Sequence, residues 1–434
     1  MLKEQIMAKN TELSLRNALI YQVYVRNHTE DGTFNALISD LDRIKKLGTD
    51  IVYLMPIHPI GVEGKKGSLG CPYANRDYRA VNPEYGTMDD FIRLADEIHR
   101  RGMKLMIDVV YNHTSPDSVL RYEHPEFFYH SADGSFGNRF GDWADVIDFD
   151  HTNPALADYL VETLKFWAQY VDGFRCDVAS LVPVSLWKRA RQECEEIKPG
   201  IIWLAETVHT SFNCLARIEG MELIYSDAEG YEAFDIEYDY DIREKLDDYW
   251  AGKRPLHEYI DALNHHEAEF PANYIKLRCL ENHDQPRIAG RIQDPIALSN
   301  WNAFMFFQKG TPMIYAGQEF CDQNQPSLFD IDRVNWTGRD ISAEITALAA
   351  FKKAHYPENA WFSAETVDEK HTVIARCGNK NTCLLGTFTL RGTAECLYVD
   401  IPDGEYENLL SGERAEVKNG KIHTDGKPLV LKIK

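Results

Sequence analysis

The chain has 434 residues, of which 44% are apolar and 26% charged, and its formal net charge at pH 7 is −21. That length and composition are typical of a globular protein with more than one domain. The negative charge argues against a nucleic-acid partner, because phosphate binding needs a basic surface. No run approaches the roughly 18 apolar residues of a membrane-spanning helix, so we predict no membrane partner either.

The N-terminal segment and the cysteines bear on the cellular compartment. Residues 1–5, Met-Leu-Lys-Glu-Gln, carry charged and polar side chains where a signal peptide has an apolar core. The nine cysteines are scattered and form no close C-x-x-C pair, which favours free thiols in a reducing cytoplasm. We therefore expect a cytoplasmic protein, with a trimmed secreted form as the alternative.

The first part of the chain alternates short apolar runs with amphipathic segments. Residues 18–25, 51–54 and 104–110 have the β-branched and aromatic content of strands. Between them, apolar residues recur at helical spacing in two segments that end at Gly48 and Gly102, which predicts two helices. Strands that alternate with helices through short connections form parallel βα units.

This alternation stops after the third strand and then resumes. Residues 111–152 are rich in Asp, Ser, Gly, His and aromatics without an apolar period, and a stretch of that length is usually functional. We predict a small excursion between the third strand and its helix. Five more strands complete eight βα units, and we predict them at residues 170–174, 201–205, 221–225, 275–280 and 311–315.

The predicted fold is α/β: a (β/α)8 TIM barrel with a short insertion after its third strand and a C-terminal antiparallel β-sandwich. The C-terminal part has a different sequence pattern from the barrel, because short strand-like runs there alternate with Gly- and Asp-rich turns. We place the catalytic barrel at residues 1–110 and 153–358, the insertion (domain B) at residues 111–152 and the C-terminal β domain at residues 359–434.

Three acidic residues, Asp177, Glu206 and Asp284, follow predicted strands. In a (β/α)8 barrel the C-terminal ends of all strands open onto one face, where catalysis occurs. Three converging acids suit cleavage of a glycosidic bond, which needs a nucleophile, a proton donor and stabilisation of positive charge. A single acid at a strand end is more often a helix cap or part of a loop ion pair, but three together favour catalysis.

Six sequence motifs, in the order in which the family has them, resemble the α-amylase family of glycoside hydrolases (family thirteen). The resemblance extends over nearly the whole chain. The four conserved blocks of that family are matched by DVVYNH, GFRCD, WLAE and ENHD, at residues 108–113, 173–177, 203–206 and 281–284. Residues 73–78, YANRDY, resemble the loop that supplies a stacking tyrosine. Residues 310–319, from GTP to GQE, resemble the signature of the eighth strand.

The resemblance implies a catalytic role for each acid. Asp177 would be the nucleophile that forms a β-glycosyl-enzyme intermediate. Glu206 would be the general acid and then the base that activates water, and Asp284 would bind sugar hydroxyls and stabilise the distorted transition state. Arg175 lies two residues before Asp177, on the same face of its strand. It would keep Asp177 ionised, because a nearby cation lowers the pKa of a carboxylate.

The resemblance also implies substrate-binding residues. His113 and His283 would hold the sugar at the cleavage subsite, with Asp108 as support, and Tyr73 would stack on that sugar ring. Arg287 belongs to a segment, HDQPR, that resembles the oligosaccharide-cleaving branch of the family. It also occupies a position that some members use for chloride, and we count it among the substrate-binding residues.

No cofactor is expected to be required, and calcium is the alternative. Asn112 matches a calcium ligand of the family, and Asp142, Asp145 or Asp148 would supply further oxygen ligands. Many members carry a Lys-His pair shortly after the nucleophile that helps to bind glucan and calcium. Residues 178–181, Val-Ala-Ser-Leu, replace that pair here, so the calcium ligand set is incomplete.

The function that the resemblance implies is a retaining α-glycoside hydrolase acting on α-1,4-glucans and maltooligosaccharides through a covalent glycosyl-enzyme intermediate. Val178 resembles members that act on α-1,6 bonds, and a sugar can replace water as the acceptor. The alternatives are therefore an α-1,6-preferring or exo-acting oligosaccharide α-glucosidase, or a glucan transglycosylase. A non-catalytic carbohydrate-binding relative would lack one of the acids, all of which are present. The expected partner is an α-glucan or oligosaccharide; oligomeric state stays open.

Overall fold

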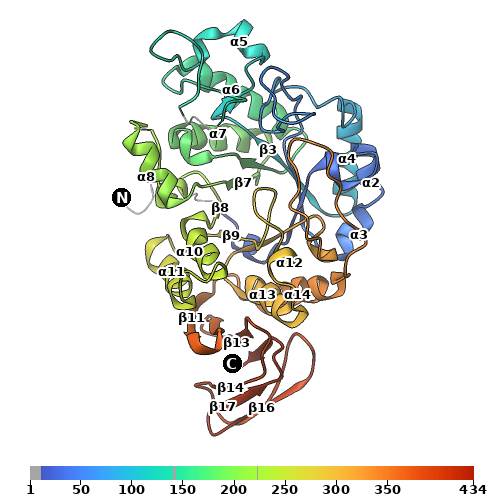
Figure 1. Cartoon of the computed structure of the whole chain (residues 1–434), viewed down its shortest axis with the longest axis vertical. Helices are drawn as coiled ribbons and strands as arrows, with labels where there is room; N and C mark the ends of the chain where they lie inside the picture. Colours follow the sequence, from blue (N-terminus) through green and yellow to red (C-terminus); the bar gives the residue numbers. More distant parts are fainter. Residues whose placement is uncertain (1–10, 140–142, 222) are drawn as a thin grey trace.

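The computed structural model describes residues 11–139, 143–221 and 223–434. Its centre is a closed barrel of eight parallel strands in the order β1-β10-β9-β8-β7-β6-β3-β2 (Figure 1). The predicted TIM barrel is thus confirmed. Its strands are β1 (Ile20–Val23), β2 (Ile51–Leu54), β3 (Lys104–Val109), β6 (Gly173–Cys176), β7 (Ile202–Ala205), β8 (Ile236–Tyr238), β9 (Lys276–Arg278) and β10 (Thr311–Tyr315).

The barrel strands are buried on both faces, which explains why most of them are short, continuous apolar runs. Side chains such as Tyr53, Met106 and Leu277 fill the interior as one apolar cluster. Gly173 lets β6 approach β7 closely, because a Cβ at that position would lie 2.9 Å from the Ile202 carbonyl oxygen. The register places Asp108 of β3 level with Arg175 of β6, which brings two polar residues together inside the barrel.

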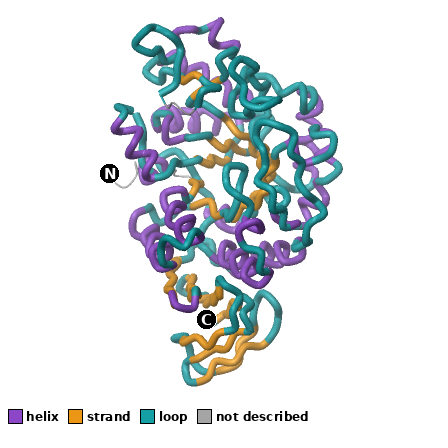
Figure 2. The backbone as a smooth tube through the Cα atoms, viewed as in Figure 1, coloured by secondary structure: helices purple, strands orange, loops and turns teal. Residues whose placement is uncertain are grey.

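Helices surround the barrel (Figure 2), and some of them begin at a side-chain cap. The α4 helix begins with a capping box between Thr87 and Asp90 and ends just before Gly102. The helices are α1 (Val25–His28), α2 (Phe34–Ile38), α3 (Leu41–Lys46), α4 (Met88–Arg100), α5 (Val119–Glu123), α6 (Pro154–Ala168), α7 (Val184–Ile197), α8 (Thr210–Ile218), α9 (Asp227–Gly230), α10 (Tyr240–Trp250), α11 (Leu256–Glu269), α12 (Ile288–Arg291), α13 (Pro295–Phe307) and α14 (Ser342–His355).

The sixth barrel strand was predicted wrongly. We expected it at residues 221–225, but the sixth strand is β8, further along the chain. Ile224 in the expected segment is buried in a small cluster with Leu181, so its apolar character serves loop packing. The true strand has only three residues and carries Glu237, whose side chain forms an ion pair with Lys276 of β9.

The excursion after β3 contains little regular structure. Its two-residue strands β4 (His113–Thr114) and β5 (Ile147–Asp148) pair in antiparallel orientation, and α5 lies between them in the chain. Phe127 and Phe128 of this excursion are each 2% exposed and belong to the core. The pairing of His113 with Asp148 ties the excursion to the catalytic face of the barrel.

Two four-stranded antiparallel sheets form the C-terminal part, as predicted (Figures 1 and 2). Apolar side chains from both sheets, including Ile374, Leu385 and Val417, pack between them. One sheet has the order β11 (Trp361–Val367), β12 (Thr372–Gly378), β13 (Cys383–Thr389), β18 (Leu429–Lys432), and the other β14 (Glu395–Tyr398), β17 (Lys421–Thr424), β16 (Arg414–Lys418), β15 (Gly404–Glu407). In the described ranges, no helix combines the length and apolarity needed to cross a bilayer.

Candidate active site

The three predicted acids lie beyond the C-terminal ends of barrel strands, on the face where (β/α)8 enzymes carry their active sites. Asp177 directly follows β6, Glu206 directly follows β7, and Asp284 lies in the loop after β9. Asp177 and Glu206 are each 6% exposed, whereas the Asp284 side chain is 42% exposed. Two acids are therefore enclosed, and the third stands at the opening.

Arg175 joins the buried acids through one guanidinium group. Its Nη1 atom lies 2.8 Å from Asp108 Oδ1 and 2.9 Å from Asp177 Oδ1. Its Nη2 atom lies 2.7 Å from Glu206 Oε1. The arginine side chain is fully buried, so these ion pairs are shielded from water. One cation thus holds three carboxylates in fixed positions.

A single positive charge among buried carboxylates affects their protonation. Burial raises the pKa of Glu206, and the Arg175 charge opposes this effect without cancelling it. Burial, followed by the charge of Glu206, also raises the pKa of Asp177. Arg175 lowers the pKa of Asp177, as we expected, but it does not outweigh burial. The cluster therefore tends to retain a proton, which is what a general acid requires.

The backbone directly after Asp177 contacts Glu206. The Val178 N–H donates a hydrogen bond to Glu206 Oε2 at 2.8 Å. Val178 adopts φ 34° and ψ 45°, a left-handed conformation that is exceptional for a β-branched residue. Strained backbone of this kind persists where the surroundings enforce it, often at functional sites. Our sequence reasoning considered only the side chain of Val178 and missed this contact.

Tyr73 and His283 form a stacked pair beside Asp284. Their ring centroids are 5.2 Å apart, and His283 Nε2 lies 2.6 Å from the Tyr73 hydroxyl and 3.0 Å from Asp284 Oδ2. Gln22 Nε2 donates to His283 Nδ1 at 2.8 Å, which places the imidazole proton on Nε2, facing Asp284. The Tyr73 hydroxyl also donates to Asp108 Oδ2 at 2.9 Å. The site residues thus form one hydrogen-bonded network.

Sequence reasoning missed two further members of this network, Gln22 and Tyr53. The Tyr53 hydroxyl donates to Asp108 Oδ2 at 2.5 Å, so Asp108 binds two tyrosines as well as Arg175. Both missed residues lie on the first two barrel strands, where they look like ordinary strand residues. Alternation along the strand was the available signal, because it predicts which side chains face the interior.

His113 lies near the carboxylate oxygen of Asp177 that Arg175 does not contact. Its Nε2 atom is 4.0 Å from Asp177 Oδ2, and its ring centroid is 5.2 Å from that of Trp143. Burial lowers the pKa of His113 to about 4, so the imidazole is neutral near pH 7. A neutral imidazole with an N–H can donate a hydrogen bond to a sugar hydroxyl without adding a charge to the cluster.

Arg287 stands apart from these contacts. Its Nη1 atom pairs with Glu281 Oε1 at 2.6 Å and its Nη2 atom lies 3.4 Å from Asp322 Oδ2. The guanidinium also lies over the Tyr315 ring at 4.4 Å and is almost completely buried. A chloride ion would have to compete with two carboxylates for this arginine. Its predicted substrate-binding role stays a prediction.

The residues expected to bind calcium do not fit a calcium site. Among the described residues, the Oδ1 atoms of Asn112 and Asp148 are buried without a hydrogen-bond partner. However, the other carboxylate oxygen of Asp148 accepts from the Arg139 backbone N–H, and the Arg139 guanidinium lies 3.5 Å from it. Asp145 is paired with Lys66 at 2.8 Å. Two cationic side chains thus lie where a divalent cation would have to bind. Asp142 lies outside the described residues.

Comparisons with known proteins agree with this fold. The family model described as alpha amylase, catalytic domain, matches residues 20–133 and 129–372. The chain belongs to the α-amylase family of glycoside hydrolases. A second model, described as the bacterial alpha amylase C-terminal domain, matches residues 363–431. Together the two models extend from the first barrel strand to the last strand of the β-sandwich.

Solved and curated members of the α-amylase family resemble the chain to different degrees. An α-amylase structure from Lactobacillus plantarum is 43% identical with a TM-score of 0.93, covering 97% of this chain and all of that one. A noncanonic maltogenic α-amylase from Thermotoga neapolitana is 33% identical with a TM-score of 0.84, covering 96% and 99%. Alpha-amylase 3 of Dictyoglomus thermophilum is 25% identical, over 74% of this chain and 68% of that protein.

The chain spans about half the length of other curated relatives that it matches. These are named as maltosyltransferase and intracellular maltogenic amylase. Their names cover hydrolysis and glycosyl transfer, two outcomes of the same α-glucan chemistry. The family membership therefore supports an α-amylase-type glycoside hydrolase.

Proposed function

We propose that this protein is a retaining hydrolase of α-1,4-glucans and maltooligosaccharides, with Asp177 as the nucleophile and Glu206 as the acid and base. The observation that carries the proposal is the Arg175 guanidinium, which contacts Asp177 through one terminal nitrogen and Glu206 through the other. Retaining glycosidases need a nucleophile and an acid about 5–5.5 Å apart, and a shared guanidinium suits such a short separation.

In the first step, an Asp177 oxygen attacks the anomeric carbon while the glycosidic bond breaks. The electron pair of that bond passes to the leaving oxygen, which takes the Glu206 proton. The raised pKa of Glu206 favours this donation. His283, held by Gln22, and Asp284 would bind hydroxyls of the sugar that becomes distorted, and the neutral His113 would bind another.

In the second step, the Glu206 carboxylate removes a proton from water, and the water oxygen attacks the anomeric carbon. The bond to Asp177 breaks, the α configuration is restored and Glu206 is again protonated. The Val178 N–H would keep the Glu206 carboxylate oriented in both steps. The same intermediate reacts with a sugar hydroxyl if one occupies the place of the water.

A second candidate is a glucan transglycosylase, or an α-1,6-preferring or exo-acting oligosaccharide α-glucosidase. The Val178 side chain favours it, because it packs in a partly exposed apolar group with Trp143 and Phe212 beside the nucleophile. An apolar wall there would favour a sugar face over water as the acceptor. A carbohydrate-binding relative without catalysis is disfavoured, because all three acids and Arg175 are present and in contact with the network.

The test is a product profile on maltoheptaose, isomaltotriose, pullulan and trehalose, resolved by chromatography. Short maltodextrins released from maltoheptaose alone, with retained α configuration by proton NMR, are the expected result. Cleavage of isomaltotriose, or products longer than the substrate, would favour the second candidate. Absence of turnover on all four substrates would refute the proposal.

A further inference from the structure

The barrel strand β8 carries none of the three acids, yet the residues that follow it contact the loops of two of them. In the barrel, β8 lies between β7, which precedes Glu206, and β9, which precedes Asp284 (Figure 1). Tyr240, the first residue of α10, follows the C-terminal end of β8 by two residues and is 5% exposed. It therefore lies on the catalytic side of the barrel. The proposed mechanism gives this tyrosine no role.

The Tyr240 hydroxyl contacts the loop that carries Asp284. Asn282, two residues before Asp284, donates a hydrogen bond from Nδ2 to Tyr240 Oη at 2.8 Å. The other end of the same amide faces the loop backbone, because Asn282 Oδ1 accepts from the N–H groups of Asp284 at 2.9 Å and Gln285 at 3.1 Å. Asn282 is completely buried, so water does not compete for these bonds. One amide thus links Tyr240 to the backbone of Asp284.

The two ends of the Asn282 amide need different partners. The two backbone N–H groups require its oxygen, so its NH2 group must find an acceptor on the other side. Tyr240 Oη is that acceptor. Burial, followed by the charges of Asp284 and Glu206, raises the pKa of Tyr240, so the phenol is a neutral hydroxyl near pH 7. Without this hydroxyl, the buried NH2 group would lose its partner and the amide would be held from one side.

The aromatic ring of Tyr240 is held independently of its hydroxyl. The His209 ring stacks on it with centroids 4.8 Å apart and an interplanar angle of 9°. The Tyr238 ring meets it at 5.0 Å and 64°. His209 lies three residues after Glu206 in the chain. A phenylalanine at position 240 would keep both ring contacts, so Tyr240→Phe removes the hydrogen bond to Asn282 and leaves the packing beside Glu206 in place.

We propose that Tyr240 is a positioning residue for Asp284 and that it acts through the Asn282 amide. The inference rests on the proposed function, because it takes Asp284 as a group that binds the distorted sugar. The Asp177 side chain is enclosed and fixed by Arg175, whereas the Asp284 side chain is 42% exposed. The placement of Asp284 therefore depends more on its backbone, and the Asn282 amide is what holds that backbone.

The first test is a double-mutant cycle on the hydrolysis of maltoheptaose. Tyr240→Phe should lower kcat/KM about two- to tenfold, the loss expected for one hydrogen bond. Asn282→Ala should lower it further, because it also frees the two N–H groups of the loop. Since the hydroxyl acts through Asn282, adding Tyr240→Phe to Asn282→Ala should cause no further loss. The loss in Tyr240→Phe should be equal on α-maltosyl fluoride, whose fluoride departs without protonation, because the acid step of Glu206 is unaffected.

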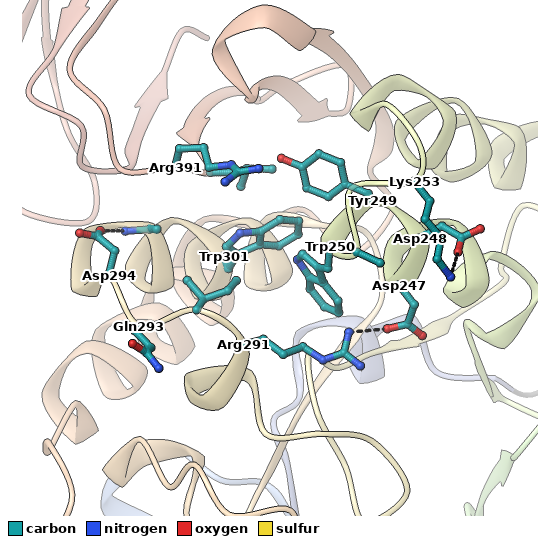
Figure 3. Close-up of a pocket in the computed structure, with 14 residues that line it drawn as sticks. Asp247, Asp248, Tyr249, Trp250, Lys253, Arg291, Gln293, Asp294, Trp301 and Arg391 are labelled. Carbon is teal, nitrogen blue, oxygen red and sulfur yellow. Dashed lines mark hydrogen bonds and ion pairs between the residues drawn. The ribbon is translucent and has the colours of Figure 1, made fainter.

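Tyr249→Phe is the matched control. Tyr249 lies nine residues further along α10, is 6% exposed, and its hydroxyl lies 3.0 Å from His371 Nδ1. It lines a pocket with Trp301 and Arg391 (Figure 3). The control removes the same group from an equally buried tyrosine, so it measures the general cost of losing a buried hydroxyl. Its kcat/KM on maltoheptaose should equal that of wild type.

The second measurement does not depend on activity. Hydrogen exchange of residues 281–287, followed by mass spectrometry, reports the opening of the loop. Tyr240→Phe should speed the exchange of this segment about two- to tenfold, and Tyr249→Phe should leave it unchanged. Unchanged exchange, wild-type kinetics in Tyr240→Phe, or losses that add in the double mutant would each overturn the inference. A wild type without turnover on any α-glucan would instead refute the proposed function, and the exchange rates would then decide the inference alone.

Discussion

Replacing Glu206 by glutamine tests the central assignment most directly. The loss of general acid and base help should lower kcat on maltoheptaose by about 10²–10⁴-fold, or roughly 2.7–5.4 kcal/mol. The structure adds a second effect. Each Glu206 oxygen now faces a donor: Oε1 lies 2.7 Å from Arg175 Nη2, and Oε2 accepts from the Val178 N–H at 2.8 Å. Glutamine has one oxygen for two donors.

One of these donors is therefore left facing an NH2 group. The amide also lacks the negative charge that is paired with the buried Arg175, and breaking a buried ion pair is destabilising, so the variant should also unfold at a lower urea concentration. Glu219→Gln, an exposed position at the end of α8, is the matched control and should change neither activity nor stability. Binding of maltoheptaose, measured by calorimetry at equilibrium, should persist in Glu206→Gln because Asp284 and His283 are intact.

The assay separates the acid role from the base role. α-Maltosyl fluoride has a leaving group that departs without protonation, so Glu206→Gln should form the covalent intermediate from it readily and then release it slowly. A burst of fluoride, followed by a slow phase that added azide accelerates, is the expected trace. Near-normal turnover of maltoheptaose, or equal losses on both substrates without a burst, would refute the reasoning.

The remaining predictions concern pH, packing and metal. Because burial raises the pKa of Glu206, its protonated form persists at pH values above the usual carboxyl pKa of about 4.3. We therefore expect kcat/KM to fall on the alkaline side of its pH profile as Glu206 loses its proton, and we expect this fall to be absent in Glu206→Gln. Gly230→Ala should lower the free energy of unfolding by about 1–3 kcal/mol, since a Cβ would overlap Glu237 Oε1, whereas Gly404→Ala, in open surroundings, should be neutral by urea titration. EDTA should leave activity and Tm unchanged, because cationic side chains already pair with the aspartates of the excursion; a loss restored by calcium would contradict this.

The barrel was predictable where strands are continuous apolar runs. The predicted bounds of β2 and β10, residues 51–54 and 311–315, match the structure because both faces of these strands are buried. The β8 strand was missed because it has three residues and Glu237 in its centre. That glutamate is paired with Lys276 on the next strand, a contact between residues far apart in the chain. Such pairing leaves no local signal in the sequence.

The candidate site was predictable as a set of acids but not as a network. Sequence motifs at the ends of strands identify the three acids Asp177, Glu206 and Asp284. The protonation of these acids depends on how deeply they are buried, and the motifs give no information about burial. The contributions of Gln22 and Val178 depend on strand facing and on a backbone amide, respectively. Side-chain motifs describe neither the facing of a strand nor a backbone contact, so these supporting contacts could be identified only from the three-dimensional structure.

The left-handed backbone at Val178 has a consequence for attempts to improve the protein. A left-handed conformation costs an L-residue roughly 1–2 kcal/mol, and Asn or Gly accepts it more readily. A library screened for heat resistance alone would therefore enrich for Asn or Gly at position 178. In such variants the backbone N–H that binds Glu206 would be held less rigidly than in the β-branched Val178. Enzymes selected in this way would gain thermal stability and lose turnover.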